Sequence, residues 1–256
     1  MISHENNVTE REHSARVRAM FAGIAGRYDL LNHLLSGNTD RRWRRLVAKK
    51  LEHVLARNGS RVLDVACGTG DLALALAEST KARVFGTDFC RPMLEVAARK
   101  SIPAGTGTIP FVEGDALKLP FSDSSFDAVT IGFGLRNLSS VEDGLKELLR
   151  VLKPDGRAAI LEFSTPVVPG FRKLFQFYFK RVLPRIGGMV SGSRSAYEYL
   201  PDSVSRFPDQ SRLAAMMREI GFEDVEYKNL TGGIAAVHLG TRPLGARLGA
   251  RSSCPP

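Results

Sequence analysis

The sequence predicts a doubly wound α/β fold, with a mostly parallel sheet and helices on both of its faces. Three observations predict it. A short apolar strand at 61–66 runs through a glycine turn into an apolar helix at 71–79, an order typical of the ligand-binding corner of such sheets. Strand and helix patterns then alternate as far as residue 163, as in successive βαβ units. Two adjacent strands at 222–229 and 234–240 predict a hairpin that makes the sheet mixed at one edge.

Two helices are expected before the sheet. The first covers 9–22 and opens with a capping box at Thr9, and the second covers 41–57 with Asp40 as its cap. The glycine-containing stretch between them, 21–37, fits no single period. It predicts either a lid over the sheet or a packed hairpin of helices.

The other elements follow from apolar periodicity and turn residues. We expect further strands at 83–87, 109–113, 126–132 and 157–163, and helices at 91–100, 141–152 (with Ser139 and Glu142 as a capping box) and 209–220. The chain is thus divided into a helical N-terminal lid at 1–57, a core at 58–240 with a cap insertion at about 166–208, and a disordered tail at 241–256.

The cap insertion contains a basic amphipathic helix. Large apolar residues recur at helical spacing over 169–186, and arginines and lysines fall on the opposite face. Three interpretations stay open for this helix. It lies on a membrane surface, it lines the mouth of an apolar pocket, or it packs on the core.

Composition narrows the class of protein. The chain has 256 residues, 43% of them hydrophobic and 25% charged, without an apolar run long enough to span a membrane. Three scattered cysteines and an N-terminus without a signal peptide favour a cytoplasmic protein, and no metal-ligand spacing is present. The net charge of +9, with a basic run at 41–45, suggests nucleic acid, the cytoplasmic membrane surface or simply a basic exterior.

Carboxylates indicate which ligand the glycine turn binds. The spacing Gly68-x-Gly70-x-x-Ala73 also fits a dinucleotide site, but Asp64 and Asp71 flank it. At 4 Å, each would repel a pyrophosphate by roughly 1 kcal/mol in water and about 4 kcal/mol near a protein surface. S-adenosylmethionine carries an ammonium, a sulfonium and no phosphate, so it is favoured over NAD. Alternatively, the two residues serve only as turn and N-cap residues.

Two further acids support that ligand. Asp88 ends the second strand, and its spacing in the sequence from Gly68 suits an acid that binds ribose hydroxyls. Asp115 and Ala116 follow the third strand, where the adenine edge would lie.

A second group follows the fourth strand, at Gly132-Phe-Gly-Leu-Arg136-Asn137. It should face the transferred group, because ligands of open α/β sheets lie outside the carboxyl ends of the strands. Arg136 offers a fork of donors for a substrate oxyanion, and Asn137 could orient a hydroxyl or a water. Alternatively, Arg136 pairs with Glu142 or Asp143, and Asn137 only turns the chain. The motif of many base-modifying methyltransferases is absent here, which argues against DNA bases.

The residues from about 16 to 240 resemble the ubiquinone/menaquinone biosynthesis C-methyltransferases. The resemblance is carried by these motifs: Arg27-Tyr-Asp-Leu-Leu-Asn32, Asp64-Val-Ala-Cys-Gly-Thr-Gly-Asp71, Phe133-Gly-Leu-Arg-Asn137, Leu161-Glu-Phe-Ser164, Tyr197-x-Tyr-Leu-Pro201 and Asn229-Leu-Thr-Gly-Gly233 with His238. It implies a class I S-adenosylmethionine-dependent fold, Rossmann-like, with seven strands and the last one reversed. It also implies donor contacts at Thr69, Asp88, Asp115, Ala116 and Gly132, where Gly132 lacks a hydroxyl that is often present, and a catalytic pair of Arg136 and Asn137.

The resemblance implies a reduced quinone with an isoprenoid tail as substrate, reached at the membrane surface, with no nucleic acid as partner. A phenolate would form and its adjacent ring carbon would take the methyl, with Asp29, His238 and Tyr28 as candidate bases. Whether the ring is a naphthoquinol or a benzoquinol, and whether the protein is an oligomer, stays open. The competing interpretations are a methyltransferase for RNA or another small molecule, a non-catalytic donor-binding protein and an NAD oxidoreductase.

Overall fold

Seven strands form one sheet at the centre of the molecule. The computed structural model describes residues 2–29, 33, 36–102, 109–167 and 194–245. The strand order is β3-β2-β1-β4-β5-β7-β6, and only β7 runs against its neighbours. The strands are β1 (Arg61–Val65), β2 (Arg83–Asp88), β3 (Phe111–Glu113), β4 (Phe126–Gly132), β5 (Leu152–Phe163), β6 (Glu223–Leu230) and β7 (Ala235–Thr241). The predicted doubly wound sheet with one reversed strand is therefore confirmed.

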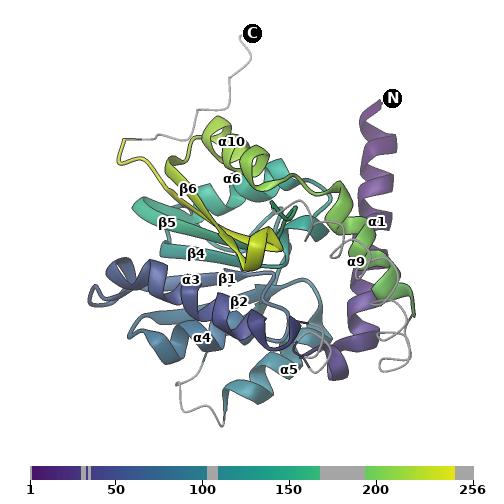
Figure 1. Cartoon of the computed structure of the whole chain (residues 1–256), viewed down its shortest axis with the longest axis horizontal. Helices are drawn as coiled ribbons and strands as arrows, with labels where there is room; N and C mark the ends of the chain where they lie inside the picture. The colour runs from purple at the N-terminus through teal and green to yellow at the C-terminus, as the bar shows by residue number, and fades with distance from the viewer. Residues whose placement is uncertain (1, 30–32, 34–35, 103–108, 168–193, 246–256) are drawn as a thin grey trace.

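Helices cover both faces of the sheet (Figure 1), and an apolar layer on each face holds them there. On one face, α3 (Thr39–Leu55) and α4 (Asp71–Ser79) pack on strand residues such as Val62 and Ala128. On the other, α6 (Val141–Val151) and α10 (Gln210–Ile220) pack on residues such as Val129 and Ile160. Successive strand residues point to opposite faces, so β1 and β4, in the middle of the sheet, bury residues on both faces.

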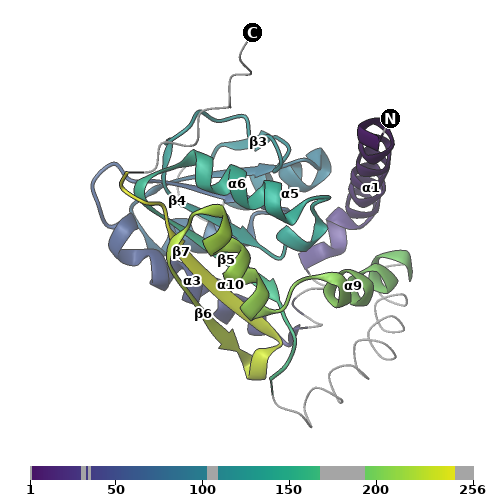
Figure 2. The same cartoon turned by 90° about the horizontal axis from the view of Figure 1, so that it is seen from above.

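Helix α5 (Arg91–Ser101) packs against β2 and β3. Helices α1 (Ile2–Ile24) and α9 (Arg194–Arg206) lie next to each other at one side of the molecule. Ile24 of α1 packs with Leu200 and Val204 of α9, so segments far apart in sequence meet there (Figures 1 and 2). Short 3-10 turns follow α1 (Ala25–Arg27), β4 (Leu135–Asn137) and β6 (Thr231–Gly233).

Helix α3 is a layer of the core. Val47, Leu51 and Leu55 are fully buried against the sheet, although the sequence placed them in an N-terminal lid. The basic run at its start is also divided, because Trp43 and Arg44 are buried while Arg41, Arg42 and Arg45 are exposed. Trp43 is thus turned inward, and the exposed arginines form a solvated face of the helix.

Several predicted helix starts were wrong. Helix α1 begins at Ile2, so Thr9 lies inside it and cannot cap it. The N-cap of α3 is Asn38, with a left-handed backbone, in place of Asp40, and the N-cap of α6 is Ser140, whose hydroxyl accepts the N–H of Asp143, in place of Ser139. Thr241 ends β7 and Arg242 is buried, beyond the predicted start of the tail. The predicted amphipathic helix at 169–186 lies outside the described residues.

Candidate functional site

The predicted corner lies at the carboxyl end of β1, where the chain turns into α4. Gly68 and Gly70 have φ values of +56° and +82°, which L side chains rarely adopt. A Cβ on Gly70 would also lie 3.0 Å from Cβ of Ala97 on α5. Glycine is therefore required at 70 both by the backbone conformation and by the close approach of α5.

Asp64 is the most unusual carboxylate of this corner. It is 1% exposed, and its Oδ1 accepts a hydrogen bond of 2.7 Å from the Thr130 hydroxyl. Its Oδ2 is buried and has no hydrogen-bond partner among the described residues. Burial raises the pKa of Asp64 to about 7, although the Thr130 hydrogen bond, the charge of Arg44 and the nearby backbone N–H of Ala73 act to lower it. An ammonium at Oδ2 would supply the missing donor and positive charge.

The other predicted acids at the strand ends have backbone partners. Asp88, at the end of β2, accepts N–H groups from Gly68 and Cys90, both at 2.8 Å. Burial raises the pKa of Asp88 even so. Asp115 accepts the Leu117 N–H at 2.9 Å. These bonds fix the carboxylates at the rim of the sheet.

An open cavity joins these residues. Its volume is about 950 Å³, counted with the solvent at its mouth. All eight residues predicted to bind the donor lie on or beside it, and seven line it directly: Asp64, Gly68, Thr69, Asp88, Asp115, Ala116 and Gly132. The eighth, Gly70, supports the turn. Gly132 has no side chain to contact Leu72. A Cβ at this position would lie 3.1 Å from Cδ2 of Leu72.

The predicted catalytic pair follows β4. Nη1 of Arg136 donates to Oε1 of Glu162 at 2.7 Å, and the Arg136 side chain is 6% exposed. The alternative pairing of Arg136 with Glu142 or Asp143 is therefore wrong. Arg136 also lies over the ring of Phe163, 5.3 Å from its centroid. It does not line the cavity itself, whereas Asn137 does.

Asn137 links the cavity to α9. Its Nδ2 donates to the Phe133 carbonyl at 3.3 Å, and its Oδ1 accepts the Tyr199 hydroxyl at 3.2 Å. Burial raises the pKa of Tyr199, and the charge of nearby Arg136 opposes this shift. Arg136, Asn137 and Tyr199, which we call the acceptor cluster, therefore form one polar group next to the cavity.

The three candidate bases have different surroundings. Tyr28 lines the cavity and packs edge-on against Phe21. Asp29 accepts hydrogen bonds from the Thr69 hydroxyl and, at 2.6 Å, from Nζ of Lys100. Both come from the segment after α1, so this segment contacts the donor corner.

His238 is not part of the cavity. It lies on β7, is 1% exposed, and its Nε2 is 2.8 Å from the Gln210 carbonyl of α10. Burial lowers its pKa. The structure thus corrects the prediction that His238 is a candidate base, because its side chain points into the packing between sheet and helix.

Sequence reasoning missed four partners in the site. Glu162 and Lys100 were given no role, and Arg44 was seen only as part of a basic run. Tyr199 belonged to a recognised motif, but its contact with Asn137 was not foreseen. The signal that could have found Glu162 is its place directly after the apolar run of β5, at the same sheet edge as Arg136.

A sheet with one reversed strand, whose strand ends carry acids around a glycine turn, defines the class I S-adenosylmethionine-dependent methyltransferases. The model of the ubiE/COQ5 methyltransferase family matches residues 9–242, and the chain belongs to that family. Its methyl donor is accordingly S-adenosylmethionine, and the unpaired Oδ2 of Asp64 fits the ammonium of that donor.

Two relatives show how close the match is. One from Thermus thermophilus, named demethylmenaquinone methyltransferase, is 51% identical over 225 residues, which are 88% of this chain and 100% of the relative. Another from Citrifermentans bemidjiense, named ubiquinone/menaquinone biosynthesis C-methyltransferase UbiE, is 51% identical over 235 residues, covering 90% and 98%. These names give no support to RNA as the substrate.

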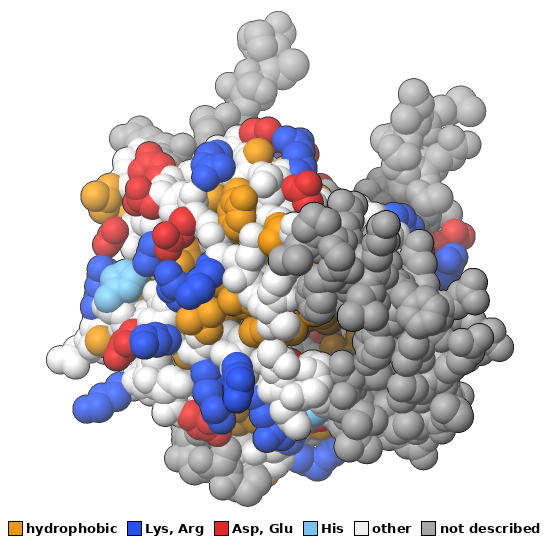
Figure 3. Space-filling view, viewed as in Figure 1, with side chains coloured by type: hydrophobic (Ala, Val, Ile, Leu, Met, Phe, Trp, Pro, Cys, Tyr) orange, Lys and Arg blue, Asp and Glu red, His pale blue; other side chains and the backbone are white. Residues whose placement is uncertain are grey.

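A solved structure agrees at the level of fold. An S-adenosylmethionine-dependent methyltransferase from Thermotoga maritima superposes with a TM-score of 0.60 at 21% identity, covering 88% of this chain and 99% of that one. Identity this low shows the fold alone. Among the described residues, no helix is long and apolar enough to cross a membrane. Basic and acidic side chains are interspersed on the face in Figure 3.

Proposed function

We propose that the chain methylates a ring carbon of a reduced quinone with an isoprenoid tail, either demethylmenaquinol or the equivalent benzoquinol. The names of relatives about half identical over nearly their whole length support this substrate class. The observation that carries the proposal is the acceptor cluster, which places a held arginine and two hydrogen-bonding side chains at the carboxyl end of β4, beside the donor cavity.

The chemistry requires an anionic ring. S-adenosylmethionine supplies a methyl group that its sulfonium already activates. A quinol hydroxyl that loses its proton becomes a phenolate, whose negative charge extends to the ring carbon beside it. That carbon attacks the methyl group while the bond between the methyl carbon and sulfur breaks, which leaves S-adenosylhomocysteine, and loss of the ring carbon's own proton restores the aromatic ring. The protein therefore has to favour the phenolate and hold the ring in line.

Arg136 is suited to favouring the phenolate. Its guanidinium is buried, and Glu162 and the Phe133 carbonyl hold it through Nη1. Its Nε is buried without a hydrogen-bond partner among the described residues. A fixed cation in a site with little water stabilises a developing oxyanion, and losing one such donor typically costs about 10²- to 10³-fold in rate.

Asn137 and Tyr199 would orient the ring hydroxyl. Asn137 lines the cavity, and Tyr199 fixes its amide from α9. We propose that the hydroxyl proton passes to a water held by Asn137. Tyr28 and Asp29 remain the candidate acceptors beyond that water, since both belong to the segment next to the cavity.

The isoprenoid tail implies contact with a lipid surface. We propose peripheral association with the inner face of the cytoplasmic membrane, supported by the substrate's insolubility and by the basic amphipathic pattern at 169–186. A vesicle-flotation assay with and without anionic lipid tests this. Failure of the protein to float with either kind of vesicle would contradict the proposal.

The substrate is tested with labelled S-adenosylmethionine and two acceptors that are both kept reduced, demethylmenaquinol and a demethylated benzoquinol. Label should enter the lipid fraction of one or both. Incorporation into neither acceptor, with donor binding intact, would overturn the proposed substrate class.

The role of Arg136 has its own test. Arg136→Ala should lower methyl transfer by about 10²- to 10³-fold while the dissociation constant for the donor stays the same. Arg136→Lys is the control that keeps the charge and loses the fork. An equal loss of donor affinity in Arg136→Ala would mean that Arg136 is structural.

A further inference from the structure

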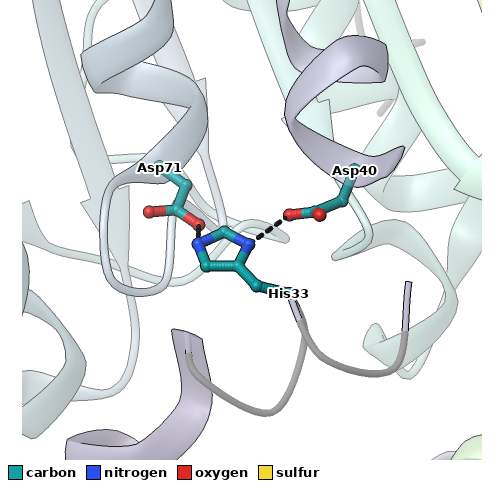
Figure 4. Close-up of side chains that lie close together, drawn as sticks. All are labelled: His33, Asp40 and Asp71. Atoms are coloured by element: carbon teal, nitrogen blue, oxygen red, sulfur yellow. Dashed lines mark hydrogen bonds and ion pairs between the residues drawn. The ribbon is translucent and has the colours of Figure 1, made fainter. Parts of the chain in front are cut away.

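A polar cluster joins the start of α3 to the start of α4. It consists of His33, Ser36, Asp40, Arg44 and Asp71, and we call it the α3–α4 cluster. Nδ1 of His33 is 2.8 Å from Oδ2 of Asp40, and its Nε2 is 3.8 Å from Oδ2 of Asp71 (Figure 4). The Ser36 hydroxyl donates to Oδ1 of Asp40 at 2.6 Å. None of these residues had a role in the methyl transfer derived above.

The cluster has the ligand types of a metal site, but its charge is already balanced. One ligand atom each from His33, Asp40 and Asp71 lies within 4.8 Å of the others. Nη1 of Arg44, however, is hydrogen-bonded to Asp40 and lies 3.4 Å from Oδ2 of Asp71. Lys100 binds the other oxygen of Asp71. The carboxylates therefore already face cations, and their effect is to hold the Arg44 guanidinium.

Arg44 is held in one orientation. Its side chain is 10% exposed, and Asp40, which bonds to it, is nearly fully buried. Burial disfavours the charged form of Asp40, but hydrogen bonds from Ser36 and Arg44 and the charge of Arg44 outweigh it and lower its pKa. Within the part of the chain that the structure describes, both ion pairs of Arg44 use Nη1. No hydrogen bond or ion pair with a described residue uses Nη2 or Nε of Arg44, so these donors can serve a ligand.

The charges around the donor cavity are one-sided. Asp64, Asp71, Asp88 and Asp115 line it, and Arg44 is the one cationic side chain among its described lining residues. S-adenosylmethionine brings two cations, which these acids suit, but also a carboxylate on its methionyl end. That carboxylate would be repelled by every charged lining residue except Arg44.

The geometry of the methionyl end restricts further where the carboxylate of the donor can bind. The ammonium and the carboxylate of the methionyl end are bonded to the same carbon, so the groups that bind them must be neighbours. The unpaired Oδ2 of Asp64 fits the ammonium, and the charge of Arg44 acts on Asp64. Both residues line the same cavity.

We propose that Arg44 binds the methionyl carboxylate of the donor, and that Asp40, with His33 and Ser36 behind it, is the positioning residue for that guanidinium. The inference rests on S-adenosylmethionine as donor and not on the quinol. A guanidinium fork matches a carboxylate with two parallel hydrogen bonds. The N-terminal part of the chain thereby supplies a binding residue to the cavity formed by the sheet.

Two ligands that differ only in the carboxylate test this. Calorimetry would compare S-adenosylmethionine with its decarboxylated analogue on the full chain, without any quinol. The wild-type protein should bind the carboxylated ligand about 10- to 100-fold more tightly, the range for a hydrogen bond between charged groups. Arg44→Met should remove that preference while leaving affinity for the decarboxylated analogue within about threefold.

Matched variants separate this role from a structural one. Arg45→Met removes the exposed neighbour on the same helix and should leave both affinities unchanged. Equal affinity of the wild-type protein for the two ligands would overturn the proposal, as would equal weakening of both by Arg44→Met. Loss of the preference in Lys100→Met but not in Arg44→Met would assign the carboxylate to Lys100 and overturn it too. Should Arg44→Met fail to fold, Arg44→Lys serves, and it should reduce the preference.

Discussion

Asp64 and Glu162 are both carboxylates near the ends of strands, and each is 1% exposed, but their surroundings are opposite. Glu162 pairs with Arg136 and accepts the backbone N–H groups of Phe163 and Arg136. Asp64 has the Thr130 hydroxyl and an oxygen without a hydrogen-bond partner among the described residues. The half of the site that faces the acceptor is thus electrostatically complete, whereas the half that holds the donor requires a cation from the ligand.

The largest effect is expected from breaking the ion pair between Arg136 and Glu162 in the acceptor half of the site. Glu162→Gln leaves the buried Arg136 without its counter-charge, so the free energy of unfolding should fall by about 3–5 kcal/mol. The double variant Glu162→Gln with Arg136→Met should recover part of that loss, because it removes both charges. Urea unfolding of the three proteins measures this. A loss below about 1 kcal/mol in Glu162→Gln would mean that the pair is not coupled in solution.

In the donor half of the site, binding of the donor should depend on Asp64 and on pH. Asp64→Asn keeps the side-chain shape and should weaken donor binding about 10- to 100-fold, as expected for a lost charged hydrogen bond. The wild-type carboxyl, with its pKa raised to about 7, has to lose its proton to bind the ammonium. Donor affinity of the wild type should therefore fall as the pH drops below about 7, and Asp64→Asn should lack that dependence. Calorimetry between pH 6 and pH 8 tests both statements.

The sign of the effect on stability follows from the same pKa. Between the ordinary pKa of Asp and about 7, the folded protein keeps a proton on Asp64 that the unfolded chain has released. The contribution of this group to stability is therefore lost as the pH rises through that window. The test compares the stability of the wild-type protein without donor with that of Asp64→Asn. A rise of the wild-type stability relative to the variant over this pH window would contradict the raised pKa.

A smaller effect is expected where the two halves meet. Tyr199→Phe removes the hydroxyl that bonds Asn137 but leaves the bond from Asn137 to the Phe133 carbonyl. A neutral hydrogen bond contributes about 0.5–1.5 kcal/mol, so the methyl-transfer rate should fall about 2- to 12-fold with unchanged donor affinity. Single-turnover kinetics measure the rate. A loss far above 100-fold would indicate that the Tyr199 hydroxyl takes part in proton transfer itself.

The smallest effect concerns Gly132, on the border of the donor cavity. Gly132→Ser adds a hydroxyl toward the cavity, and its Cβ meets only the flexible end of Leu72. Donor affinity should rise about twofold, since one added hydrogen bond is partly offset by movement of Leu72. Gly132→Ala is the matched control, with the methylene but no hydroxyl. Equal donor affinity of the two variants would show that the added hydroxyl does not contact the donor.

Elements bounded by strong local signals were predictable from the sequence. Helix α4 and strand β4 agree with the predicted ranges because a glycine turn and clear apolar runs mark their ends. Helix α1 has no such signal, and it extends back to Ile2. Neighbouring hydroxyls also compete to cap a helix, so the sequence predicted Ser139 where Ser140 is the cap of α6.

The site divides in the same way. Strand-end acids such as Asp64 and Asp88 could be predicted because parallel strands bring their carboxyl ends to one edge. Their partners could not, since Tyr199 lies 62 residues from Asn137 in the sequence and meets it only through the packing of α9. His238 belonged to a recognised motif, but a motif does not specify which face of β7 a side chain occupies.

Helix α3 sets the smallest fragment that can fold. Trp43 donates its indole N–H to the Thr231 hydroxyl at 3.2 Å, beyond the last parallel strand, while the adjacent Arg44 faces the cavity. A recombinant fragment beginning at residue 58 would lack this helix, and the sheet residues that Val47, Leu51 and Leu55 cover, such as Val62 and Ala128, would be exposed. Such a fragment should aggregate when expressed. Any attempt to shorten the protein from its amino terminus therefore has to stop before Thr39.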